Sequence, residues 1–100
     1  MSIEYFGKPE PVLSNEVIEA TVNSLLDAKE FRVVRRKDCE LGVGFIENEN
    51  PEQETVTIII KPDEIYAGFH ACHVSQRDKI LSFLVSSVKQ GGSSCQFDEE

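Results

Sequence analysis

The run ETVTIIIKPDEIYAGFHACH, residues 54–73, decides the fold, because apolar side chains recur at every second position along much of it. Successive side chains of a β-strand point to opposite faces, so this alternation is typical of strands with one buried face. The turn-forming residues Pro62, Asp63 and Glu64 divide the run in two. We therefore predict two antiparallel strands, at residues 54–61 and 65–73.

Two more strands are predicted upstream, at residues 31–36 and 41–46, with a short polar turn between them that suits a hairpin. From residue 41 onwards, two-residue alternation predicts one face that forms the core. Its members are Leu41, Val43, Phe45, Val56, Ile58, Ile60, Ile65, Ala67, Phe69 and Ala71. The opposite face would present Gly42, Gly44, Ile46, Thr55, Thr57, Ile59, Tyr66, Gly68, His70 and Cys72. Its glycines leave the backbone accessible to close approach.

Two amphipathic helices complete the pattern. The first is predicted to begin at an N-cap, Ser14, and to end near Lys29, with apolar residues at the three-to-four spacing of one helix face. The second is predicted to open on the capping-box-like segment 75–78 and to end at Gly91 and Gly92. Short strands are expected at residues 3–6 and 95–97.

The predicted order is therefore β-α-β-β-β-β-α-β, which indicates an α+β fold. Its short central connections favour a mostly antiparallel sheet, with the two amphipathic helices on one face. The 100 residues predict one domain, 1–97, followed by an acidic frayed tail, 98–100.

Composition restricts the compartment and the partners that we expect. Three widely spaced cysteines, an odd number, are not typical of a small secreted scaffold, and the N-terminal residues show no apolar run of a signal peptide. We therefore expect a cytoplasmic protein. The formal net charge of −8 argues against nucleic acid and against membrane as partners, because phosphate contacts need basic side chains.

The charge is unevenly distributed along the chain. Residues 38–64 carry eight carboxylates and one lysine, whereas residues 29–37 carry five bases and one acid. In an antiparallel meander, the segment 47–54 lies at the end of the sheet with few bases nearby, chiefly Arg32 and also Arg77 or Lys79. We predict that its carboxylates bind a protein partner. These residues are Glu47, Glu49, Glu52 and Glu54.

The sequence predicts no catalytic, cofactor or metal site. His70, Cys72 and His73 are the only residues grouped like metal ligands, but alternation on a strand would send His73 to the opposite face from the other two. A cysteine–histidine nucleophilic pair would need an oxyanion loop and an orienting group, and neither can be singled out. We therefore expect that the protein is not an enzyme.

In its size, its acidity and its order of elements, the chain resembles bacterial immunity proteins, including those of contact-dependent growth inhibition systems. That resemblance implies an inhibitor that neutralises a cognate toxin domain, often a basic nuclease, through carboxylates. One alternative is a dimeric secretion chaperone that uses residues 55–60 or the second helix as an apolar groove. Another is a small enzyme or metal-binding domain that uses His70 and Cys72. The sequence leaves open whether the protein is a monomer or a dimer, and whether the partner contacts the acidic loop, the open sheet face or the tail.

Overall fold

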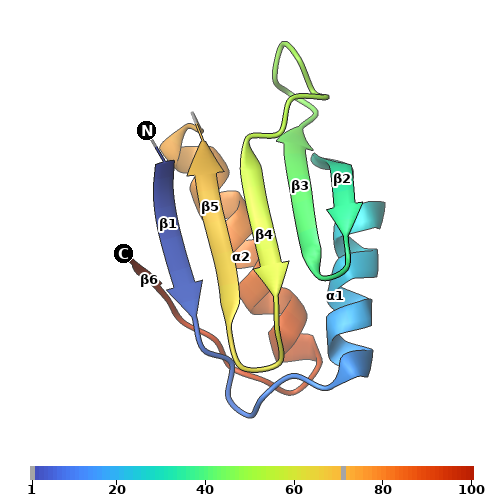
Figure 1. Ribbon diagram of the computed structural model, residues 1–100, viewed down its shortest axis with the longest axis vertical. Helices are drawn as coiled ribbons and strands as arrows, with labels where there is room; N and C mark the ends of the chain where they lie inside the picture. Colours follow the sequence, from blue (N-terminus) through green and yellow to red (C-terminus); the bar gives the residue numbers. More distant parts are fainter. Residues whose placement is uncertain (1, 71) are drawn as a thin grey trace.

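The fold is an antiparallel sheet with helices on one of its faces (Figure 1). The computed structural model describes residues 2–70 and 72–100, and within these residues six strands form one sheet. The elements are β1 (Ser2–Gly7), α1 (Asn15–Asp27), β2 (Phe31–Lys37), β3 (Glu40–Phe45), β4 (Val56–Ile60), β5 (Ile65–His70), α2 (Val74–Gln90) and β6 (Phe97–Glu99).

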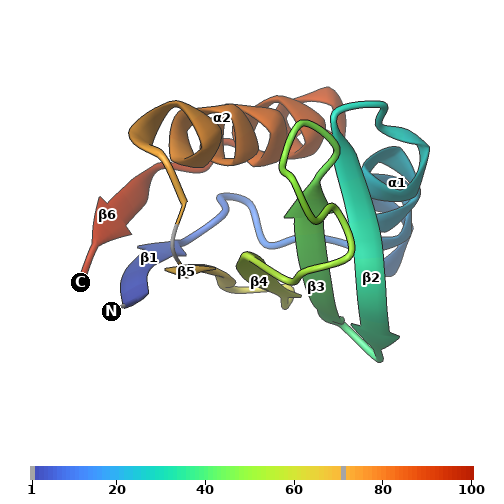
Figure 2. The ribbon, with the colours of Figure 1, turned by 90° about the horizontal axis from the view of Figure 1, so that it is seen from above.

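The strands lie in the order β2-β3-β4-β5-β1-β6, and every neighbouring pair is antiparallel. Strands β2 to β5 form a meander, β1 pairs with the far side of β5, and β6 adds a short edge strand. Helices α1 and α2 lie on the same side of the sheet (Figure 2). The predicted α+β class and element order are confirmed.

The core lies between the sheet and these helices. The face predicted to be buried is confirmed along β3, β4 and β5, where its side chains are at most 2% exposed; Ala71 falls outside the described residues. The buried side chains of these strands form one core cluster with apolar helix residues such as Leu25, Ile80 and Leu84, each fully buried. Burying one such side chain contributes about 1.5–3 kcal/mol, so this single layer supplies most of the drive to fold.

The two helices begin differently. As predicted, Ser14 caps α1, and its hydroxyl oxygen accepts a hydrogen bond from the Val17 N–H at 3.2 Å. The predicted cap of α2 is wrong, because that helix begins at Val74 with His73 as its N-cap. The buried Gln76 side chain accepts a hydrogen bond from the His73 N–H at 3.4 Å. Gln76 thus has the capping-box role that the sequence predicts for Asp78.

The sequence predicts a frayed tail at residues 98–100, but residues 98 and 99 belong to strand β6. Strand β6 pairs with β1, in the register Gly7↔Phe97 and Tyr5↔Glu99. The Glu100 N–H continues the ladder by donating to the carbonyl of Glu4 at 2.9 Å. Without β6, the outer edge of β1 would expose unpaired backbone groups, and pairing them outweighs the poor strand propensity of the acids.

Candidate functional site

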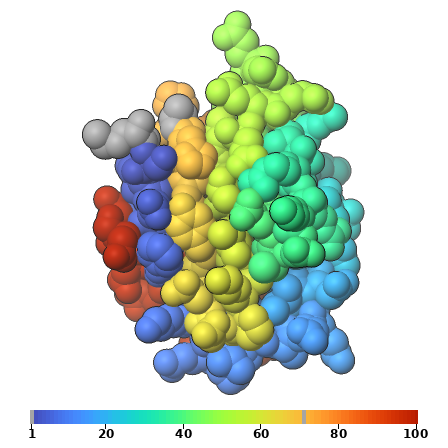
Figure 3. Space-filling model, in the orientation of Figure 1, coloured from blue at the N-terminus to red at the C-terminus, as the bar shows by residue number. Residues whose placement is uncertain are grey.

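Among the described residues, no helix or strand covers the face of the sheet opposite the helices (Figure 2). Figure 3 looks onto this open face, with β1, β5, β4 and β3 side by side. Seven of the residues predicted to face this side belong to strands and do so, as the cross-strand register shows: Gly42, Gly44, Thr57, Ile59, Tyr66, Gly68 and His70.

The prediction is wrong at two other positions. Thr55 is only 5% exposed, and Cys72 packs against the core with its thiol donating to the Thr55 carbonyl at 3.3 Å. Strand β5 ends at His70, so the alternation used to place Cys72 stops before that residue. His70 and Cys72 therefore do not share a face. Burial raises the pKa of the Cys72 thiol, which keeps it protonated and weakens it as a nucleophile or metal ligand.

The loop between β3 and β4 projects beyond the end of the sheet and carries the predicted partner-binding carboxylates (Figures 1 and 3). It is tied to the molecule from both sides. The Gln76 amide of α2 donates to Glu47 at 2.8 Å and to the Asn48 side chain at 2.9 Å. From β2, Arg32 forms an exposed ion pair with Glu52 at 2.9 Å.

The backbone of this loop rests directly on β3 at Gly44. A Cβ atom at that position would lie 2.7 Å from the Gln53 carbonyl oxygen and closer still to that of Pro51. Both obstacles are main-chain atoms, so only glycine permits this approach. The sequence predicts that these glycines allow a close approach to the backbone. At Gly44, the group that approaches is the backbone of the β3–β4 loop.

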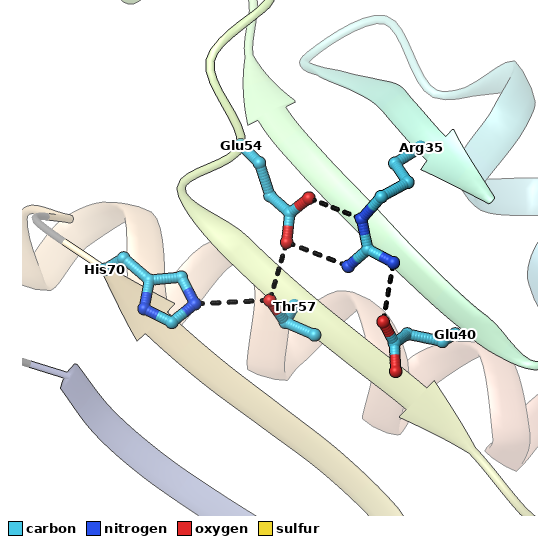
Figure 4. Close-up of polar contacts among 5 residues, drawn as sticks. All are labelled: Arg35, Glu40, Glu54, Thr57 and His70. Carbon is cyan, nitrogen blue, oxygen red and sulfur yellow. Dashed lines mark hydrogen bonds and ion pairs between the residues drawn. The ribbon is translucent and has the colours of Figure 1, made fainter. Parts of the chain in front are cut away.

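A network of charged and polar groups extends from the loop across the open face (Figure 4). Arg35 donates two hydrogen bonds to Glu54, from Nε at 2.8 Å and from Nη2 at 3.0 Å, and a third to Glu40 at 2.5 Å. The Thr57 hydroxyl donates to Glu54 at 2.8 Å. The Thr57 oxygen also lies 3.2 Å from Nε2 of His70.

A β-bulge places Arg35 in this network. The register pairs Val33 with Val43, on the core side, but pairs Arg35 with Gly42, on the open side. Residues two apart on a regular strand share a face, so the extra residue Val34 re-aims Arg35. The sequence does carry a signal for this, because the two adjacent valines interrupt the alternation of β2.

Arg35 therefore joins Glu54 of the acidic loop to Glu40 of β3, and it is a base beside the loop that the sequence did not predict there. The Arg35 hydrogen bonds hold the pKa of Glu54 below its usual range, against an opposing effect of burial, and the donation from Thr57 adds to the lowering. The two carboxylates also raise the pKa of Arg35. Glu54 is thus a fixed anion with a structural partner, which suits loop positioning better than proton transfer.

The four predicted carboxylates therefore differ in their surroundings. Glu54 is held by Arg35 and Thr57, and its side chain is 27% exposed. Glu47 and Glu52 are exposed although each has a polar partner, and Glu49 is exposed near the tip of the loop. The loop brings these last three together as one acidic projection.

Comparison with protein-family models, with curated proteins and with solved structures finds no match to this chain. The geometry must therefore carry the functional argument. Within residues 2–70 and 72–100 there is no group of three or more His, Cys, Asp or Glu side chains placed to hold a metal ion. Nor is any helix in these residues long and apolar enough to cross a membrane.

Proposed function

We propose that this protein is a small acidic inhibitor that binds another protein, and that it acts as an immunity protein for a cognate toxin domain such as a basic nuclease. The observation that carries the proposal is the β3–β4 loop, which combines protrusion, negative charge and a fixed conformation. The resemblance in size, charge and element order points the same way. The partner is a protein surface rich in Lys and Arg.

The anchoring of the loop favours binding. Ordering a flexible loop on association costs free energy, and a loop that is already held in place avoids much of that cost. Gln76 and Arg32 hold the loop by side-chain contacts, and Gly44 lets its backbone lie close on β3. Exposed carboxylates on such a projection accelerate encounter with a basic partner and select against acidic ones.

The predicted carboxylates take two roles in this proposal. Glu47, Glu49 and Glu52 contact the partner, because they are exposed on the projection. Glu54 is a positioning residue, because its carboxylate is already engaged by Arg35 and lies against the sheet. Replacing Glu54 would release Arg35, so Glu54 is left unchanged in the test of contact. Glutamine at positions 47 and 52 keeps the side-chain oxygen that accepts from Gln76 and Arg32, which limits the effect of the test variant on the anchoring of the loop.

The test uses the reading frames that neighbour this gene, each expressed as its C-terminal domain with and without this protein. One of them is expected to arrest growth, and co-expression of this protein is expected to restore it. The triple variant E47Q/E49Q/E52Q should reduce the association rate with that domain about tenfold and flatten its salt dependence. The matched control is E16Q/E19Q/D27N, which makes the same charge change at exposed positions of α1.

Two results would contradict the proposal. The first is that no neighbouring domain is toxic or binds this protein. The second is that the loop variant and the α1 control slow association equally, since net charge rather than the loop would then explain the effect.

A second candidate, the secretion chaperone, retains one supporting feature. A largely apolar hollow of about 610 Å³ lies between α2 and the segment that links α1 to β2, with Phe31 and Phe83 in its wall. The other groove considered, residues 55–60, is unavailable because β4 is hydrogen-bonded on both sides. A chaperone of this kind works as a dimer, so elution as a monomer in size-exclusion chromatography would count against it.

A further inference from the structure

A row of apolar side chains crosses the middle of the open face. Ile59, Tyr66 and Phe6 come from β4, β5 and β1, and the register places them directly opposite one another. The rings of Phe6 and Tyr66 lie 5.2 Å apart between centroids, tilted by 59°. All three side chains are half-buried without any covering helix. Exposed aromatic residues in a cluster are typical of binding surfaces rather than of ordinary surface.

These side chains line a hollow of about 200 Å³, together with Lys61 and Glu64. Pockets for drug-sized ligands usually have volumes of about 300–1,000 Å³, so this hollow is small for such a ligand. Its volume corresponds to about six or seven water molecules, at about 30 Å³ each. That is room for one long side chain from a partner.

The surroundings of the hollow are negatively charged. Glu64 stands in its wall, and Asp98 lies opposite Phe6 on β6. Glu4 lies on the same face of β1 as Phe6, two residues away. Burial, followed by the charge of Glu4, raises the pKa of the Tyr66 hydroxyl. Lys61 is the one base among the lining residues, and Lys8 shares a neighbouring hollow with Phe6 and Asp98. Three carboxylates against these two bases leave a net negative charge, which favours a cation as the occupant.

We propose that this hollow receives an arginine side chain of the partner protein. The guanidinium would stack on the rings of Tyr66 and Phe6 and pair with the carboxylates of Glu4 and Glu64. Arginine fits better than lysine, because its planar group stacks on aromatic faces and donates in a fork that matches a carboxylate. This inference rests on the proposed function for the nature of the partner, and it adds a second contact surface to the acidic loop.

The experiment titrates the isotope-labelled protein with acetyl-Ala-Arg-Ala-amide and follows backbone amide resonances by NMR. The shifts are expected to concentrate at residues 4–6 and 59–66. The matched peptide with lysine should bind more weakly, and the one with norleucine should not produce these shifts. Shifts that concentrate on residues 47–54 instead, or equal shifts with all three peptides, would overturn the inference.

Variants locate the interaction. E4Q/E64Q should weaken binding of the arginine peptide about tenfold, whereas E16Q/E19Q, with the same charge change on α1, should weaken it less than twofold. Y66F keeps the ring and should bind normally, whereas Y66L should not. Urea unfolding of each variant separates lost binding from lost folding. If Y66L is folded and binds as well as Y66F, the ring makes no contact and the inference fails.

The outcome is separable from that of the proposed function. The loop variant E47Q/E49Q/E52Q should still bind the arginine peptide. Peptide binding without any neighbouring toxin would leave the hollow standing and remove the immunity role. If E4Q/E64Q binds the toxin with full affinity and the arginine peptide produces no shifts in the unmodified protein, the immunity role stands and the arginine contact is wrong. If the same resonances shift with protein concentration alone, the occupant is a second copy of this chain and the inference is wrong.

Discussion

Gly44→Ala tests most directly whether the backbone of the acidic loop is held against the sheet. The added Cβ would lie 2.7 Å from the Gln53 carbonyl oxygen and closer to that of Pro51, so the loop must move away or β3 must bend. Forcing extra atoms into a close-packed contact costs about 1–3 kcal/mol. Alanine offsets about 0.4–1 kcal/mol of this cost, because it restricts the unfolded chain more than glycine does. This gain applies at Gly44 because its φ is not positive, so alanine can adopt the same backbone conformation.

The net expectation is a destabilisation of about 1–2 kcal/mol. For a domain of this length, that lowers the melting temperature by about 4–16 °C. Urea unfolding at 25 °C gives the free energy directly, and NMR amide shifts at residues 48–53 report whether the loop has moved. Because its anchoring would be lost, the variant should also bind the partner more slowly.

Gly68→Ala is the matched control, because the atoms that a Cβ would meet there belong to the far end of the Tyr66 side chain. A flexible side chain can swing aside, so we expect a change within about 0.5 kcal/mol. If Gly44→Ala is as stable as the control and leaves the loop resonances unchanged, the loop backbone does not press on β3. Contact with β3 would then not be what fixes the loop.

Two further predictions concern the network and the core. Glu54→Gln should destabilise the protein at pH 7 and do so less at pH 3. The pKa of Glu54 is lowered on folding, so the stability that its carboxylate contributes is present above the unfolded pKa of about 4.3 and is lost as the pH falls through the folded pKa. If urea unfolding shows that the variant loses the same free energy of unfolding at both pH values, this prediction is wrong. Ile58→Ala should cost about 2–5 kcal/mol and Ile59→Ala less than half as much, because adjacent residues of β4 face opposite sides; similar costs would contradict the assigned register.

Local patterns were sufficient to predict the sheet. Two-residue alternation identifies the buried face of β3, β4 and β5 because burial acts on every second side chain of a strand. The cap of α1 follows from Ser14 alone, since that interaction spans only three residues. Short connections between the central strands then leave an antiparallel meander as the economical arrangement.

The errors arise where distant parts of the chain decide the outcome. Strand β6 forms because β1 offers it an open edge, which the acidic composition of the tail does not reveal. Gln76 replaces Asp78 in capping α2, with its amide also bonded to the β3–β4 loop. The pairing of Arg35 with Glu54 depends on a bulge that turns the Arg35 side chain to the open face, and regular strand alternation does not predict such a bulge.

The sequence alone does not predict the row of apolar side chains formed by Phe6, Ile59 and Tyr66. Ile59 and Tyr66 were placed on the open face, but Phe6 was not joined to them because the position of β1 beside β5 is a long-range contact. Only the register shows that the three side chains meet. The signal available beforehand was an aromatic residue in β1 with no assigned place in the core.

One partner could contact both the acidic loop and the aromatic hollow. The molecule measures 38 × 27 × 21 Å, and the open face lies across the two longer dimensions (Figure 3). A standard protein interface buries about 800 Å² on each side, which is comparable with most of that face. The bases Arg32 and Arg35 stand on β2 at one edge of it, while Asp98 stands on β6 at the other. Because ion pairs with the loop and with Glu40 neutralise both arginines, they do not repel a basic partner, which can contact the loop and place one arginine in the hollow.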